Sequence, residues 1–426
     1  MMPTIRKTAS SCSGRLKRVS CDPMVKGVVN FSGEKLTEAR LAKGLSKKAL
    51  AEKIGVTSMA ISRYESNQDK PTHDKLDSIA TALGFPYDFL TRRAWPESLG
   101  PTFWRNQVAE TKASREMTEQ RMKWLCEIFW TLEDELDFPH LDVPDLDVPN
   151  DFRQITPLMI EKYAEQVRRE WKFRQLPIQD VVLSVENAGV PVVMLKIASE
   201  KQDGFFFRSS ILNRGFIGVN VNDTTAVRAR FDVAHELGHL LLHRNVTASQ
   251  ERDTNDHRVL EQQAHRFAGA FLFPRESFLE EIAVPTLDYF YANKKRWGMS
   301  IAAMVTRSSD LGLIEKETKS QMYISMNRRG WRGSGNREPF DDTMELERPR
   351  MIRRGVEALV ESGEYSDDFL EHMLSLPRNE IEQLVGCVRG GIPVGNPIPV
   401  PAARSVVQAT DLETGQVIKF QARRRG

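Results

Sequence analysis

Apolar residues recur at helical spacing in short segments between residues 33 and 90. Glycine or proline separates the segments, at positions 44, 55, 71 and 84, and both residue types interrupt helices. The pattern predicts a bundle of about five short helices. The apolar positions expected to form its core are Leu36, Leu41, Leu45, Leu50, Ile54, Val56, Ile61, Leu76, Ile79 and Leu83.

The rest of the chain combines longer amphipathic helices with a few short apolar runs. Helical periodicity covers 110–137, 157–171, 178–188, the stretch from 275 to about 313, and 350–384. Runs typical of strands are 190–195, 204–207, 214–221, 322–327 and a small hairpin within 405–420. Prolines and repeated aspartates at 138–150 predict an exposed crossing segment. We therefore expect an α+β protein that is mostly helical, with a small sheet.

Within the first bundle, Ser46 and Thr57 are placed to cap two successive helices, with Gly55 in the turn between them. This spacing indicates a helix-turn-helix, whose second helix enters the major groove of DNA. Exposed residues early in that helix would read bases, and cationic residues would contact phosphates. The base-reading candidates are Thr57, Ser58, Met59 and Ser62, and the phosphate candidates are Lys47, Arg63 and Lys70. For Met59 a packing role stays open, because both roles need an apolar side chain.

The most specific chemical pattern is His235-Glu236-x-x-His239, on an apolar helix. One helical turn brings the two imidazoles onto the same face, where they can share a Zn²⁺ ion with Glu236 beside it as general base. A catalytic zinc ion also needs a third protein ligand. Glu261, on the next predicted helix, is the candidate, and His265 is the alternative. The pattern predicts metal-assisted hydrolysis.

Other polar residues near this pattern have less defined roles. His243 follows His239 by four residues and is expected to support the ligands, because three successive turns spread too far along the helix axis to meet one ion. Asp256 and His257 are expected to be solvated in a loop between the two helices. The candidates for stabilising an oxyanion are Tyr289, Tyr291 and His257.

Two resemblances to known families follow from these residues. The helix-turn-helix segment resembles the Xre/Cro-type DNA-binding domain. The residues that carry this resemblance are Leu45, Ser46, Leu50, Ala51, Gly55, Val56, Ile61, Ser62 and Glu65. The later segments resemble the ImmA/IrrE family of zinc metallopeptidases, through His235, Glu236, His239, Glu261, Ala264, Phe267, Ala268 and Pro274. This second resemblance implies a compact zincin-like domain in which His235, His239 and Glu261 bind zinc and Glu236 is the catalytic base. At His265 the chain departs from the family, which commonly has Asn or Asp there.

These patterns divide the chain into regions with distinct expected roles. The regions are a basic flexible tail (1–32), an Xre/Cro-type helix-turn-helix domain (33–92), a helical connector with a Pro/Asp-rich crossing segment (93–150), a zincin-like domain (151–325), a C-terminal helical region (326–388), and a Pro/Gly linker with a short tail (389–426). Translation from Met24 is the alternative to translation from Met1, because the basic tail precedes the first helix without any structural signal of its own.

Composition adds constraints on compartment and partners. The net charge of +2 points to no particular partner, and the four cysteines, Cys12, Cys21, Cys126 and Cys387, lack the spacing of a disulfide framework or a cysteine-zinc site. No apolar run has the length needed to cross a bilayer, and the basic start lacks the apolar core of a secretory signal. We therefore expect a cytoplasmic protein with no membrane partner.

Two functional hypotheses fit this sequence. The first is a transcriptional regulator that binds double-stranded operator DNA and carries a zinc endopeptidase domain, with a repressor or antitoxin as the protein substrate. The alternative is a transcription factor or antitoxin whose zinc domain senses or binds a partner without proteolysis. Glu236 favours the enzyme, because a purely structural zinc site fills all four positions and needs no base. A homodimer is expected if the operator is a palindrome.

Overall fold

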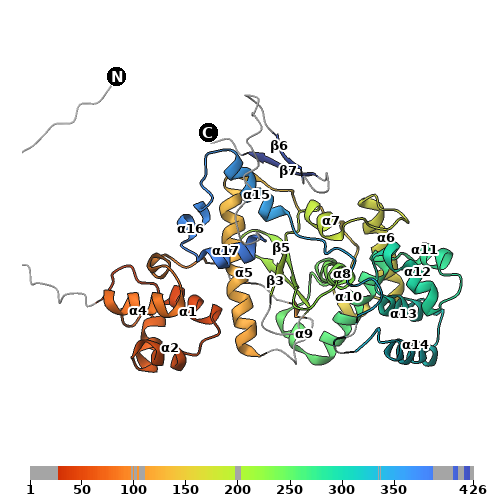
Figure 1. Ribbon diagram of the computed structural model, residues 1–426, viewed down its shortest axis with the longest axis horizontal. Coiled ribbons are helices and arrows are strands. Elements are labelled where there is room, and N and C mark those ends of the chain that lie inside the picture. Colours follow the sequence, from red (N-terminus) through yellow and green to blue (C-terminus); the bar gives the residue numbers. More distant parts are fainter. Residues whose placement is uncertain are drawn as a thin grey trace, which may run out of the picture.

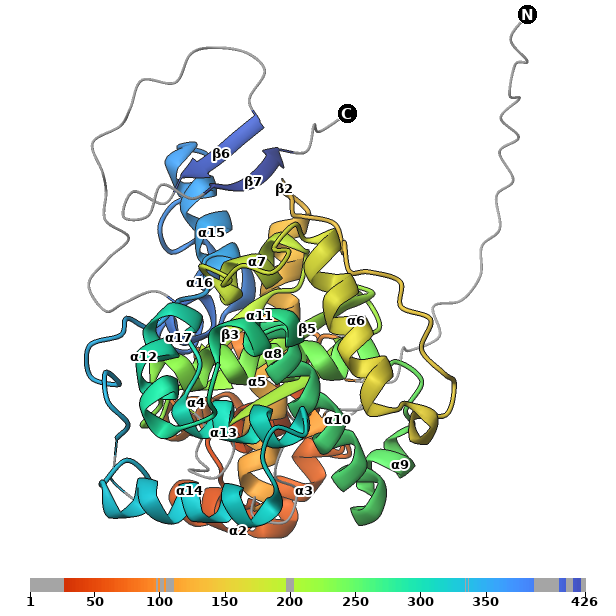
Figure 2. The ribbon, with the colours of Figure 1, turned by 90° about the vertical axis from the view of Figure 1, so that its right-hand side faces the viewer.

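The computed structural model describes residues 27–96, 99, 103–104, 111–196, 203–333, 335, 337–386, 406–410 and 417–422. Helices dominate and two small sheets accompany them, which confirms the predicted α+β, mostly helical class (Figures 1 and 2).

The helices are α1 (Gly33–Ala42), α2 (Lys47–Ile54), α3 (Ser58–Glu65), α4 (His73–Leu83), η1 (Tyr87–Thr91), α5 (Lys112–Glu133), η2 (Phe152–Gln154), α6 (Pro157–Glu170), α7 (Val181–Asn187), α8 (Ala226–Leu242), α9 (Ala248–Arg252), α10 (Thr254–Leu272), α11 (Arg275–Glu281), α12 (Leu287–Trp297), α13 (Ile301–Asp310), α14 (Lys316–Arg328), α15 (Met351–Glu361), α16 (Phe369–Leu374) and α17 (Arg378–Val385). The strands are β1 (Phe103–Trp104), β2 (Leu136–Asp137), β3 (Val192–Leu195), β4 (Gly204–Ser209), β5 (Arg214–Asn220), β6 (Val406–Thr410) and β7 (Val417–Ala422).

The helices α1–α4 and the 3-10 helix η1 form the N-terminal bundle. The side chains of Ser46 and Thr57 accept hydrogen bonds from the backbone N–H groups of Ala49 and Ala60, at 3.1 and 3.2 Å, and so cap α2 and α3. Gly55 ends α2 with φ at +65°, a conformation that favours glycine. Most of the predicted core positions are buried, whereas Leu41, Leu45 and Val56 are only partly covered.

The long helix α5 lies between this bundle and the rest of the protein (Figure 1). It packs against α1 and against α15, α16 and α17. Its residues Met122, Trp124, Leu125, Ile128 and Phe129 have no exposed surface. In the structure this helix is a central element of the core, because the N-terminal bundle and the C-terminal helices both cover it.

The larger sheet has the strand order β1-β4-β5-β3. The strands β4 and β5 form an antiparallel hairpin, β3 runs parallel to β5, and β1 runs antiparallel to β4. Helix α8 packs against β4 and β5. On the other face, the ring of Phe216 stacks on that of Phe207, at 5.0 Å between centroids, and contacts Phe129 of α5 edge-on. The sheet is thus enclosed between α8 and α5.

Two expectations for irregular or extended segments are wrong. Residues 322–327 belong to helix α14 and not to a strand, and Met326 is fully buried while Ile324 is 40% exposed. The run is apolar, but buried and exposed side chains alternate along it with the period of a helix. The polar residues before the run form the first part of the same helix. The crossing segment 138–150 is also only partly exposed, since Leu146 and Val148 belong to the buried core.

The C-terminal strands β6 and β7 pair as the expected hairpin, and β7 also pairs with β2. The turn between them, the basic tail up to residue 26, the Pro/Gly linker, and the cysteines at 12, 21 and 387 lie outside the described residues. Cys126 is buried. Across the described part of the chain, no helix is both long enough and apolar enough to span a membrane.

Candidate metal centre and nucleic-acid interface

Helices α8 and α10 position the predicted metal ligands. Thr225 caps α8 through a hydrogen bond from the N–H of Arg228, and Asp253 caps α10 through hydrogen bonds from two backbone N–H groups. A Cβ atom on Gly238 would come within 3.2 Å of the Ala264 Cα atom. Small residues at these two positions therefore let the helices approach closely enough for their ligand side chains to meet.

The side chains of His235, His239 and Glu261 converge on one point. Their facing atoms are separated by 3.1 Å (His235 Nε2 to His239 Nε2), 3.1 Å (His239 Nε2 to Glu261 Oε1) and 3.2 Å (His235 Nε2 to Glu261 Oε2). Zinc bonds of roughly 2.0–2.1 Å in tetrahedral geometry place neighbouring ligand atoms about 3.3 Å apart. The donor set and its spacing therefore fit a zinc ion.

The electrostatics of the cluster keep its carboxylate charged. Burial by itself would raise the pKa of the Glu261 carboxyl, but the proximity of His235 and His239 lowers that pKa well below its usual value. An ionised carboxylate between two imidazoles is the form that binds a cation.

His243 and Gln263 orient the His239 ring. The Gln263 amide donates from Nε2 to the Phe152 carbonyl at 2.8 Å, so its oxygen faces His243 Nε2 at 2.9 Å and accepts from it. His243 Nδ1 is then the acceptor for His239 Nδ1–H, also at 2.9 Å. Burial, followed by the proximity of His239, lowers the pKa of His243 well below its usual value and keeps the ring neutral. This chain of hydrogen bonds leaves the lone pair of His239 Nε2 directed at the cluster.

Glu236 lies on the β4 side of the cluster. Its side chain is buried, with 1% of the residue exposed. A Cβ atom on Gly204 would come within 2.8 Å of Glu236 Oε1, so a larger residue where β4 passes would displace the carboxylate. Sequence reasoning identified neither Gly204 nor Gln263, because both act through contacts between elements that are distant in sequence.

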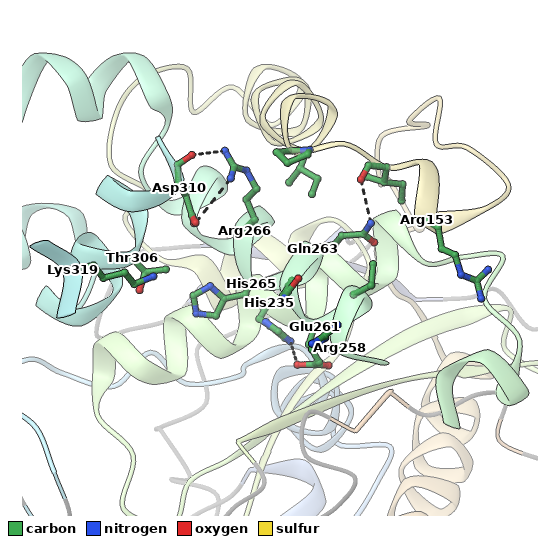
Figure 3. Close-up of a pocket in the computed structure, with 15 residues that line it drawn as sticks. Arg153, His235, Arg258, Glu261, Gln263, His265, Arg266, Thr306, Asp310 and Lys319 are labelled. Atoms are coloured by element: carbon green, nitrogen blue, oxygen red, sulfur yellow. Dashed lines mark hydrogen bonds and ion pairs between the residues drawn. The ribbon is translucent and has the colours of Figure 1, made fainter. Parts of the chain in front are cut away.

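A cavity of about 680 Å³ opens beside the cluster (Figure 3). His235, Glu261 and His265 line it, together with the cationic residues Arg153, Arg258, Arg266 and Lys319. The His265 ring lies 6.5 Å from that of His235, centroid to centroid, and stays outside the three-ligand cluster. The geometry thus favours Glu261 over His265 as third ligand.

The remaining candidates around the site lie elsewhere than expected. Asp256 and His257 belong to α10 and not to a loop. The Asp256 carboxylate is paired with the Arg153 guanidinium at 3.0 Å, from Nε to Oδ1. Tyr289 and Tyr291 are each 41% exposed, and neither is among the described residues that line the cavity.

The predicted DNA-contacting residues gather around the start of α3. Thr57, Ser58, Met59 and Arg63 are exposed, and Met59 is 65% exposed, which favours contact with a partner over packing in the core. The remaining candidates already have partners within the protein. Lys47 Nζ contacts Ser62 Oγ at 3.2 Å and Glu65 Oε2 at 3.1 Å, and Lys70 Nζ donates to the Val29 carbonyl at 2.6 Å.

An ion pair that the sequence analysis did not identify fixes α3 in the bundle. Arg40 of α1 binds Glu65 at the end of α3, with Arg40 Nε 2.5 Å from Glu65 Oε1. Arg40 also donates to the Leu45 carbonyl at 2.7 Å. Because both side chains of the pair are nearly buried, α3 is held at a defined angle with its first turn exposed.

Comparison with known proteins agrees with both parts of the molecule. Residues 36–90 match the family described as helix-turn-helix, and residues 185–309 match the peptidase family described as the IrrE N-terminal-like domain. Over 66 residues the chain is 36% identical to uncharacterized HTH-type transcriptional regulators of Rickettsia prowazekii and Rickettsia conorii. These matches cover 16% of this chain, and 51% and 53% of the relatives, so the chain spans about half the length of each relative. The chain therefore joins a helix-turn-helix domain to an IrrE N-terminal-like domain.

Proposed function

We propose that this protein is a DNA-binding transcriptional regulator with a zinc-dependent endopeptidase domain that cleaves a regulatory protein, such as a repressor or an antitoxin. The observation that carries the proposal is the convergence of His235, His239 and Glu261 on one point, with Glu236 one residue from the first ligand. A structural zinc site has no need of a carboxylate that is not a ligand. The match to a peptidase family supports the same reading.

The residues of the site have distinct roles in this proposal. His235, His239 and Glu261 hold the zinc ion, which supplies Lewis acidity and a water of lowered pKa when bound. Glu236 accepts a proton at its carboxylate and passes it to the leaving amine. His243 and Gln263 hold the His239 ring, so that its Nε2 lone pair keeps its direction. The buried surroundings of α8 limit the access of bulk water to Glu236 and His239.

The N-terminal bundle brings this site to DNA. In the proposal, α3 enters the major groove of an operator, with Thr57, Ser58, Met59 and Ser62 at the bases and Lys47, Arg63 and Lys70 near phosphates. Lys47 and Lys70 must exchange their internal partners for phosphates to do so. We further propose that the protein acts as a homodimer in the cytoplasm, since a palindromic operator needs two copies of the reading helix.

A Glu236→Gln variant tests the peptidase. Because Glu236 is not a ligand, the variant should keep about one zinc ion per chain while its cleavage of a repressor falls by at least a hundredfold. His235→Ala should lose both metal and cleavage, and the exposed Glu280→Gln should change neither. Metal is measured by mass spectrometry of the purified chain, and cleavage by loss of the full-length repressor.

The same experiment distinguishes the alternative function. Equal loss of the repressor with wild type and Glu236→Gln would exclude the peptidase. If the chain binds zinc and its DNA footprint changes when zinc is removed, while no protein is cleaved, the zinc domain is a sensor or a binding module.

A further inference from the structure

The cavity beside the metal cluster has an excess of positive charge. Its described lining includes two carboxylates, those of Glu261 and Asp310. It also includes the cationic side chains of Arg153, Arg258, Arg266 and Lys319. In the proposed function the Glu261 carboxylate binds the zinc ion, which leaves Asp310 as the described lining carboxylate that can balance these cations.

Two of the cations are already neutralised inside the protein. Arg153 pairs with the Asp256 carboxylate, at 3.0 Å from Nε to Oδ1. Arg266 Nη2 lies 3.0 Å from Glu161 Oε1, and its Nη1 lies 4.0 Å from Asp310 Oδ1. Each of these guanidinium groups therefore has a carboxylate partner, and neither is free to bind a second one.

The remaining two cations, Lys319 and Arg258, differ from each other. Burial raises the pKa of Asp310, and the positive charges of Arg266 and Lys319 oppose this rise, so Lys319 already acts on a carboxylate. Arg258 is exposed, and among the described residues no carboxylate lies within ion-pairing distance of its guanidinium. Its N–H donors are therefore available to a ligand that enters the cavity.

Helix α10 places Arg258 close to the metal ligands. Arg258 precedes Glu261 by three residues, so both side chains lie on one face of the helix and line the same cavity (Figure 3). Three residues of an α-helix rise about 4.5 Å, and one residue of an extended peptide spans about 3.3 Å. When a substrate carbonyl is at the metal, the neighbouring substrate residues are within reach of the Arg258 guanidinium.

We propose that Arg258 determines substrate specificity by binding an acidic side chain, Asp or Glu, within about two residues of the scissile peptide bond. The proposal rests on the peptidase function proposed above. A guanidinium binds a carboxylate through two parallel N–H···O hydrogen bonds, which makes the contact selective in geometry as well as in charge. A basic side chain at the same place is repelled by this unpaired charge. The preferred substrate is therefore an acidic segment of a protein.

The first test maps the cleavage sites of the zinc-loaded, full-length protein. The substrate is a randomised dodecapeptide library with acetylated and amidated ends, and the products are sequenced by mass spectrometry. We expect Asp and Glu to be enriched about tenfold over Asn and Gln at one position close to the cut, since a hydrogen-bonded charge pair is lost with the amides. Cleavage without this enrichment would overturn the acidic specificity and leave the peptidase in place.

A second library with free carboxyl ends distinguishes the two sources of a carboxylate in a peptide. If Arg258 binds an acidic side chain, both libraries should be cut at the same internal sites. Cleavage confined to the last residues of the second library would mean that the cavity binds a chain end, and would overturn the proposal.

Variants of one residue assign the preference to Arg258. Arg258→Gln should abolish the enrichment, Arg258→Lys should keep part of it because the charge stays and the planar fork is lost, and Arg258→Glu should shift the preference to Lys and Arg. The control Arg252→Gln removes an equal charge from α9, which packs against α10, at an exposed residue outside the cavity lining. It should leave the enrichment unchanged. An enrichment that persists in Arg258→Gln would exclude this residue.

A binding measurement needs no turnover and separates this proposal from the proposed function. The zinc-loaded Glu236→Gln chain is titrated, with anisotropy as the signal, into a fluorescein-labelled peptide of alternating Gly and Glu or into its Gly and Gln counterpart. The Glu peptide should bind about tenfold more tightly, and a further Arg258→Gln should remove the difference. If the wild-type chain cleaves neither library while this difference is present, the peptidase function fails and the acidic site stands. Equal affinity for the two peptides would overturn the acidic site.

Discussion

At the scale of single residues, His243 contacts His239, a proposed metal ligand, and its replacement tests whether this contact orients the His239 ring. His243→Leu removes the acceptor for His239 Nδ1–H, and the His239 ring loses the contact that fixes its tautomer. Residues that support a ligand in this way typically contribute 10–100-fold to metal affinity. We expect zinc affinity, measured by competition with a chelator, to fall by about that factor.

The control for this change is His372→Leu, a histidine that pairs with Asp368 on the surface and is far from α8 in sequence. It should leave zinc affinity unchanged. A His243→Leu chain that is folded by circular dichroism and still binds zinc as tightly as wild type would show that the His239 ring needs no such support.

The sequence predicted part of this site at the residue scale. The convergence of His235 and His239 follows from helical geometry, because residues four apart share a face. Glu261 required the additional expectation that a second helix packs against the first, which the small residues Gly238 and Ala264 permit. Gln263 and Gly204 were not predictable, since the first acts through His243 and the Phe152 carbonyl and the second through a strand that passes Glu236. The ligand roles themselves stay predictions until metal is measured.

At the scale of elements, the first turn of α3 is the part of the bundle that should decide DNA recognition. Replacing Ser58 and Arg63 together by Ala removes exposed polar and charged groups that are not needed for the core, and it leaves the Thr57 cap of α3 in place. Each lost base contact typically costs about 1–3 kcal/mol, and each lost phosphate contact also lowers the salt dependence. We expect the operator footprint to disappear at protein concentrations at which wild type protects it.

The matched control replaces Ser78 and Thr81, two exposed residues of α4, by Ala. This variant should protect the operator as wild type does. An unchanged footprint with the α3 variant would mean that another surface of the protein contacts the DNA.

Elements with a clear period were predictable, and elements defined by their neighbours were not. The helices of the N-terminal bundle, α6 and the β4–β5 hairpin follow from apolar spacing within each segment. The run 322–327 was misread because a short apolar stretch does not reveal its period without the residues before it. The pairing of β1 with β4 joins residues about a hundred positions apart, and no local pattern encodes it.

At the scale of the whole molecule, the DNA-binding bundle and the remaining chain share one core. Trp124 of α5 is fully buried and donates from its indole N–H to Glu38 of α1 at 3.1 Å. Lys35 of α1 lies 3.5 Å from Glu127 of α5. Burial raises the pKa of Glu127, and the charges of Lys35 and Arg92 oppose this rise. The bundle is thus docked on α5 by a buried network of charges and an indole, and we infer that it does not unfold independently.

A single carboxylate extends this network to the C-terminal helices, and its removal tests whether the molecule unfolds as a unit. Glu380 of α17, with a side chain 2% exposed, binds Lys43 at the end of α1 and Arg121 of α5, both at 3.1 Å. Glu380→Ala leaves Arg121 partly buried without this partner, and we expect a loss of about 2 kcal/mol, below the full cost for a buried pair because Lys43 is partly exposed. Calorimetry should show one transition in wild type and a lower melting temperature in the variant.

The neighbouring Glu382→Ala, which loses only a more exposed pair with Arg378, should melt within about a degree of wild type. Two separate transitions in the wild-type protein would mean that the bundle and the metal-site domain are independent units, and that the contacts across α5 do not couple them.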